Sequence, residues 1–181
     1  MVDVEALAGR AQRVAARSRV RMACRIAVVI VPLACLSLAN GGQVGACACL
    51  GAALFAVAAY HRWRDRAGVD AVRTGLLLGA VPLVAALGLN ACGMQCAPGW
   101  AITEAEVACF AAGAIAGIAA SLLVARTPRD RRRRWVSTIL VASLTAALGC
   151  VGLGAAGVLS TLVALVASAS VVWIPVALRA S

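Results

Sequence analysis

The residues of this chain that could carry chemistry are its cysteines. The 181-residue sequence has eight cysteines but only one His and seven acidic residues, so it offers little material for acid–base catalysis. Thiols can support disulfide exchange or metal binding. The spacing Cys-x₃-Cys of Cys92 and Cys96 has no His beside it and is not a standard zinc signature, so we expect no metal and no cofactor. The cysteines are Cys24, Cys35, Cys47, Cys49, Cys92, Cys96, Cys109 and Cys150.

Three interpretations of these cysteines remain open from the sequence. The first is a structural bridge between Cys92 and Cys96, because Gly93 allows a turn that brings their Cα atoms within the roughly 7 Å that a disulfide needs. The preceding helix should then end by about Ala91. The second is that the cysteines serve as small apolar side chains. The third is a redox role, favoured if the bridge exists, because closing so short a loop stabilises a fold little. The disulfide or redox candidates are Cys92, Cys96, Cys47, Cys49 and Cys109.

The elements that must position these cysteines are long apolar segments. The sequence is 63% hydrophobic, against roughly 45–50% for soluble domains. Each segment is close to the roughly 20 residues that a helix needs to cross a bilayer. We therefore predict an all-α integral membrane protein with six transmembrane helices, over residues 22–40, 44–61, 74–91, 105–125, 136–153 and 157–178. Residues 1–21 form a basic tail, and residues 22–181 form the transmembrane domain.

The arginines predict the orientation of these helices. All 17 basic residues are Arg, and the stretch Arg126–Arg134 alone holds six of them beside a single acid. Residues 1–25 have six, the connection between the second and third spans has four, the C-terminal end has one, and the alternate connections have none. Because cytoplasmic loops collect positive charge, this distribution predicts that both termini are cytoplasmic. The lack of Lys beside abundant Ala, Gly and Val is typical of a GC-rich bacterial genome, so we expect the bacterial inner membrane. The topology explains the net charge of +10, and we expect no nucleic-acid partner.

The tail carries a stripe of arginines. A helical spacing places Arg10, Arg13, Arg17 and Arg21 on one side, which suits binding to an anionic membrane surface or to a cytoplasmic protein partner. A tail that only sets the topology is the simpler interpretation.

Small residues recur at helical spacing in two predicted spans. Gly113, Gly117 and Ser121 share one face of the fourth span, and Gly75 and Gly79 share a face of the third. Such faces allow close helix packing within a bundle, within an oligomer or within a larger membrane complex. Val31-Pro32-Leu33 also recurs as Val81-Pro82-Leu83, which allows an arrangement of three repeated helical hairpins.

In its layout the chain resembles the six-span bacterial membrane anti-sigma factors. The likeness covers the number of spans, their orientation, the position of the tail and the pair Cys92 and Cys96. It implies a non-enzymatic membrane regulator or sensor whose tail holds a cytoplasmic partner. No sequence motif of that family is matched, so no site residue is carried over. The sequence fits a subunit of a membrane complex as well as it fits a membrane regulator. A small permease or channel is an alternative, although the central parts of the spans lack the ionisable residues of a proton-coupled transporter. A membrane thiol–disulfide oxidoreductase is a further alternative.

Overall fold

The structure is a computed structural model, and it describes residues 21, 24–39, 41–64, 66–92, 104–126 and 131–178. These residues are helical apart from short turns, and no strand occurs among them. The helices are Cys24–Ala39, α2 (Val44–Arg64), α3 (Arg66–Ala91), α4 (Glu104–Ala125), α5 (Arg131–Cys150) and α6 (Ala155–Leu178), with a short 3₁₀ turn η1 (Val151–Leu153) before α6.

Five segments are long and apolar enough to cross a membrane, namely Val44–His61, Val69–Leu89, Glu104–Ala125, Arg131–Leu153 and Ala155–Leu178. The helix Cys24–Ala39 is also apolar but shorter. Large aliphatic side chains remain exposed along these helices, as in Leu77, Leu122 and Val163. An apolar outer surface of this kind is what a bilayer requires. The predicted all-α class, with helices long and apolar enough to span a membrane, is confirmed.

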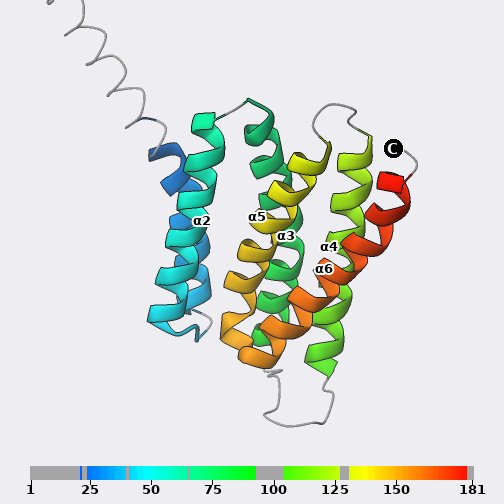
Figure 1. Ribbon diagram of the computed structural model, residues 1–181. Coiled ribbons are helices and arrows are strands. Elements are labelled where there is room, and N and C mark those ends of the chain that lie inside the picture. Colours follow the sequence, from blue (N-terminus) through cyan, green and yellow to red (C-terminus); the bar gives the residue numbers. More distant parts are fainter. Residues whose placement is uncertain are drawn as a thin grey trace, which may run out of the picture.

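The helices run antiparallel to their sequence neighbours in one bundle (Figure 1). One end of the bundle carries the start of the helix Cys24–Ala39, the end of α2, the start of α3, the end of α4, the start of α5 and the end of α6. We call this the basic end, because Arg21, Arg25, Arg73 and Arg131–Arg134 all belong to these helix ends. The other end, which we call the opposite end, carries the α5–α6 turn and the connection from Ala39 to α2.

Helix α5 is the centre of the bundle. It contacts α2, α3, α4 and α6, and 67% of the residues in its segment are buried, against 22–44% in the other four segments. The most extensive contacts join α4 to α6 and α3 to α5. These pairs are not sequence neighbours, so the packing is not organised by the hairpins that the sequence repeat suggests. The repeat itself stays a prediction.

The observed helix boundaries correct the predicted ones at two places. The third helix begins at Arg66 rather than at residue 74, and the fifth begins at Arg131 rather than at 136. Both differences have one cause: the prediction stopped at the last apolar residue, but Arg is a good helix former and the helices continue beyond the apolar segment. Four arginines predicted in a connection therefore lie in the first turn of α5. The predicted end of the third helix at about Ala91 is confirmed.

Candidate functional site

Helices α4 and α6 cross at the small-residue face of α4. Gly113 and Gly117 are both buried there. A Cβ added at Gly113 would lie 2.5 Å from the carbonyl oxygen of Thr161 in α6. A Cβ at Gly117 would collide with the Ser168 hydroxyl and the Leu165 carbonyl oxygen. The two backbones are therefore close enough that only glycine fits, and these glycines serve packing.

Helices α3 and α5 cross in the same way. A Cβ added at Gly75 would lie 2.8 Å from the Thr138 carbonyl oxygen, and one at Gly79 would lie 2.6 Å from the Thr145 Cβ. Gly149 of α5 repeats the arrangement against Leu83, at 2.6 Å from its Cα. Close contact between backbones thus holds both principal helix pairs together.

Ser121 joins three helices near the basic end. Its hydroxyl donates a hydrogen bond to the Ala169 carbonyl oxygen of α6 (2.9 Å) and accepts one from Nε1 of Trp135 in α5 (3.0 Å). The indole of Trp135 in turn stacks on that of Trp173, with ring centroids 5.3 Å apart. Ser121 is completely buried, so without it the Trp135 indole N–H would lose this partner and α4 would lose its hydrogen bond to α6.

The cysteine Cys109 meets a partner that the sequence analysis did not select. It lies against Cys150 of α5, within hydrogen-bonding range, and both thiols are completely buried. The Cys150 sulfur is 3.3 Å from the Thr161 hydroxyl, whose own proton is donated to the Gly157 carbonyl oxygen. Cys150 is therefore the donor to Thr161. A chain of hydrogen bonds thus connects α4, α5 and α6 at the opposite end of the bundle.

Cys47 takes part in a second chain of this kind. Its sulfur is 3.2 Å from the hydroxyl of Ser37, and that hydroxyl donates to the Leu148 carbonyl oxygen at 2.5 Å. Because the Ser37 proton is used there, the Cys47 thiol donates to Ser37. This chain connects the helix Cys24–Ala39, α2 and α5. In both chains a buried thiol satisfies a hydroxyl, which in turn satisfies a helix carbonyl, so the arrangement stabilises interhelical packing.

The remaining cysteine candidates are placed separately. Cys49 is exposed on α2, whereas Cys47 is buried, so this pair does not converge on one site. Cys92 follows α3 and is exposed, and Cys96 lies outside the described residues, so the Cys92–Cys96 bridge stays a prediction. Among the described residues, no group of three or more His, Cys, Asp or Glu side chains could hold a metal ion.

The predicted arginine stripe falls almost entirely outside the described residues, since Arg10, Arg13 and Arg17 belong to the first twenty positions. Arg21 is described and exposed. Nearby at the basic end, Arg134 of α5 forms an ion pair with Asp70 of α3 at 3.6 Å, which adds a polar link to the glycine contacts of the same helix pair.

Comparison with protein-family models found no match, and neither curated proteins nor solved structures gave one.

The sequence contained a signal for the Cys109–Cys150 contact. Cys109 lies six residues into α4, and Cys150 lies at the end of α5, so both are close to the same end of adjacent antiparallel helices. This pair could have been found by comparing how far each cysteine lies from the ends of its helix, rather than by the spacing of cysteines along the chain.

Proposed function

We propose that this chain is a non-enzymatic, six-span protein of a bacterial inner membrane, with both termini in the cytoplasm. It acts as a membrane regulator or as a subunit of a larger membrane complex. The tail of residues 1–21 provides the docking segment for a cytoplasmic protein partner, through Arg10, Arg13, Arg17 and Arg21. This agrees with the layout that the chain shares with the six-span membrane anti-sigma factors.

The orientation is supported by the distribution of charge. All 17 basic residues belong to helix ends and connections on one side of the bundle or to the two tails. The positive-inside rule assigns this side to the cytoplasm. The helix ends that flank these connections, of α2 and α3 and of α4 and α5, lie together at that end, as six passes require (Figure 1).

The observation that carries the proposal is the use of the polar groups inside the bundle. Ser37, Ser121, Thr145 and Thr161 are buried, and each donates a hydrogen bond to a helix carbonyl oxygen. A permease needs polar groups that face a solute near the middle of the membrane. Here Ser37 and Ser121 bond to carbonyl oxygens of another helix, Thr145 and Thr161 bond to carbonyl oxygens of their own helices, and glycine contacts join the two main helix pairs. This favours a rigid helix bundle that holds a docking segment over a bundle that contains a solute pathway.

The test is co-purification of the tagged full-length chain from its native membranes in a mild detergent. We expect a stoichiometric protein partner that is lost when residues 2–18 are deleted. Insertion should persist in that deletion, because ten arginines remain in the two inner connections. Substituting Arg25 and Arg73 to Gln provides a charge-reducing control that should keep the partner.

A monodisperse protein without a stoichiometric partner, combined with solute flux in reconstituted vesicles, would contradict this proposal. That outcome would instead favour the permease or channel. Loss of disulfide-forming activity in membranes lacking this chain would favour the thiol–disulfide oxidoreductase.

A further inference from the structure

A groove lies between α2 and α5 at the basic end of the bundle. It has a volume of about 610 Å³. Its lining combines His61 of α2 with cationic and aliphatic residues of the first turns of α5: Arg131, Arg132, Arg133, Val136 and Leu140. None of the roles proposed above uses this groove.

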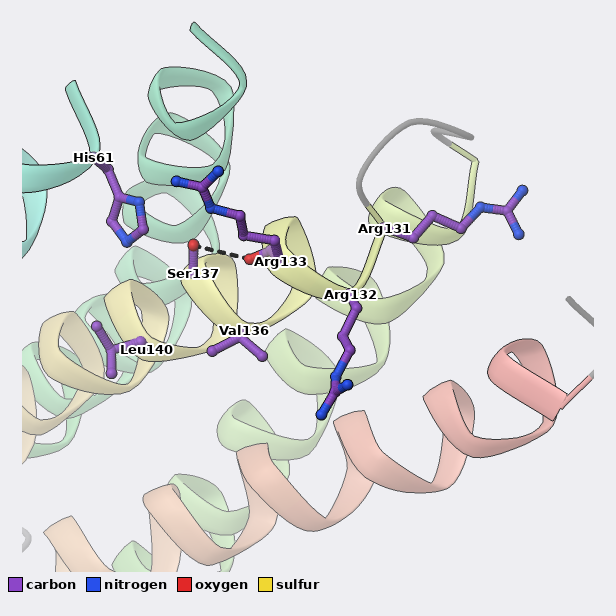
Figure 2. A pocket seen from close by; sticks show the side chains of 7 residues that line it. All are labelled: His61, Arg131, Arg132, Arg133, Val136, Ser137 and Leu140. Carbon is purple, nitrogen blue, oxygen red and sulfur yellow. Dashed lines mark hydrogen bonds between the residues drawn. The ribbon is translucent and has the colours of Figure 1, made fainter. Parts of the chain in front are cut away.

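The cationic and apolar parts of the groove follow one another along α5 (Figure 2). The Arg133 side chain extends on the same side of the helix as the His61 ring, whereas Arg131 extends away from that ring. Val136 and Leu140 come next along the helix, and their side chains are 50% and 43% exposed. The Ser137 hydroxyl between them donates to the Arg133 carbonyl oxygen at 2.9 Å, so the groove wall there is effectively apolar.

The charge around this groove selects an anion. The stretch Arg126–Arg134 has six arginines and one aspartate, a net charge of 6 − 1 = +5. Arg132 and Arg133 are exposed, so their guanidinium groups are accessible from outside the protein. Guanidinium groups bind phosphate oxygens through paired hydrogen bonds, better than any other side chain.

The apolar wall restricts the anion further. Val136 and Leu140 belong to the apolar part of the segment Arg131–Leu153, which is long enough to cross a membrane, and the groove arginines are the first residues of that segment. A ligand that fills the groove must therefore be anionic at one end and hydrocarbon along the other. A soluble phosphate compound would leave the aliphatic wall unused.

We propose that this groove binds one anionic phospholipid. Its head-group phosphate is held by Arg133 and His61, which lie on the same side of α5, and one acyl chain lies along Val136 and Leu140. Arg132 extends away from these two residues and adds positive charge nearby. Basic grooves between helices near a membrane surface suit such head groups. A smaller groove of about 220 Å³, lined by Arg25 and Arg73, has the same combination of charge and aliphatic residues but fewer arginines and less room. The larger groove is therefore the stronger lipid site.

The test is native mass spectrometry of the full-length chain in a nonionic detergent. Phosphatidylglycerol, phosphatidylcholine with the same acyl chains and inorganic phosphate are titrated separately. We expect one phosphatidylglycerol to bind at least about tenfold more tightly than phosphatidylcholine. Each neutralised arginine should weaken binding about fivefold, so the variant Arg131→Gln/Arg132→Gln/Arg133→Gln should lose on the order of a hundredfold.

The matched control is Arg21→Gln/Arg126→Gln/Arg179→Gln, which removes the same charge from three arginines that are not among the lining residues of either groove. It should retain the bound phosphatidylglycerol. The variant Leu140→Trp keeps every charge but fills the apolar part, and it should weaken lipid binding too. Circular dichroism of each variant checks that the bundle is folded.

Three results would overturn the proposal. Equal losses in the two triple variants would mean diffuse attraction to the basic end. Equal binding of phosphatidylglycerol and phosphatidylcholine would remove the anionic requirement. Displacement of the lipid by millimolar inorganic phosphate, with no effect of Leu140→Trp, would identify a phosphate site instead.

Discussion

Substituting Gly113 with Ala tests whether close backbone contact between α4 and α6 holds the bundle together. The new Cβ would lie 2.5 Å from the Thr161 carbonyl oxygen and 3.2 Å from the Thr161 Cα. To restore an ordinary contact of about 3.4 Å, the backbone of α6 would have to move by almost 1 Å. Both neighbouring atoms belong to the backbone, so no side chain can rotate away. Overpacking of this kind costs about 1–3 kcal/mol.

Gly88 of α3 is the matched control, because a Cβ there meets nothing within 4 Å. Both substitutions gain the same intrinsic helix propensity, about 1 kcal/mol for Gly to Ala. The difference between the two variants therefore isolates the overpacking. We expect Gly113→Ala to be less stable than Gly88→Ala by about 1–3 kcal/mol.

The assay is reversible unfolding by sodium dodecyl sulfate in mixed micelles, followed by circular dichroism. The free energy of unfolding is compared for the wild type, Gly113→Ala and Gly88→Ala. Equal free energies for the two variants would refute the reasoning, since they would mean that α4 and α6 do not depend on contact at Gly113.

Three further predictions concern the interior and the cysteines. Ser121→Ala should lower the free energy of unfolding by about 1–2 kcal/mol, because it removes the hydrogen bonds to the Trp135 indole N–H and the Ala169 carbonyl oxygen. Ser170→Ala is the control and should have little effect, since the Ser170 hydroxyl bonds to Val166 of its own helix; equal losses would contradict the role of Ser121. A membrane-permeant maleimide should label the exposed Cys24 at the start of the first helix but leave the completely buried Cys109 and Cys150 unmodified until the protein unfolds. Early labelling of Cys109 would argue against the buried chain of hydrogen bonds. On intact cells, a membrane-impermeant thiol reagent should label Cys92 and Cys96 only after mild reduction, and labelling of both beforehand would eliminate the bridge between them.

Much of the fold could be predicted because a membrane helix is specified by one local property, a long apolar run. The ends at Ala91, Ala125 and Leu178 follow directly from it. The beginnings of α3 and α5 could not be placed in this way, because Arg66 and Arg131 lie beyond the apolar segment and still favour a helix.

The candidate sites, too, could be predicted only in part from the sequence. The spacing of Gly113 and Gly117 predicts a common packing face, because residues four apart lie on one side of a helix. It contains no information on which helix faces them, and the partner is α6 rather than a sequence neighbour. The Cys109–Cys150 contact and the Ser121–Trp135 hydrogen bond join different helices, so they depend on how the bundle is assembled. The groove beside His61 likewise exists only once α2 lies next to α5.

The central claim is that the basic end of a six-span bundle faces the cytoplasm, where a partner can reach the tail. The most direct measurement is the location of a topology reporter fused to the chain at one of two sites. A reporter fused after Arg129, in the α4–α5 connection, should behave as cytoplasmic. A reporter fused at Ala97, between α3 and α4, should behave as exported. The reverse result at either site would contradict the six-span account.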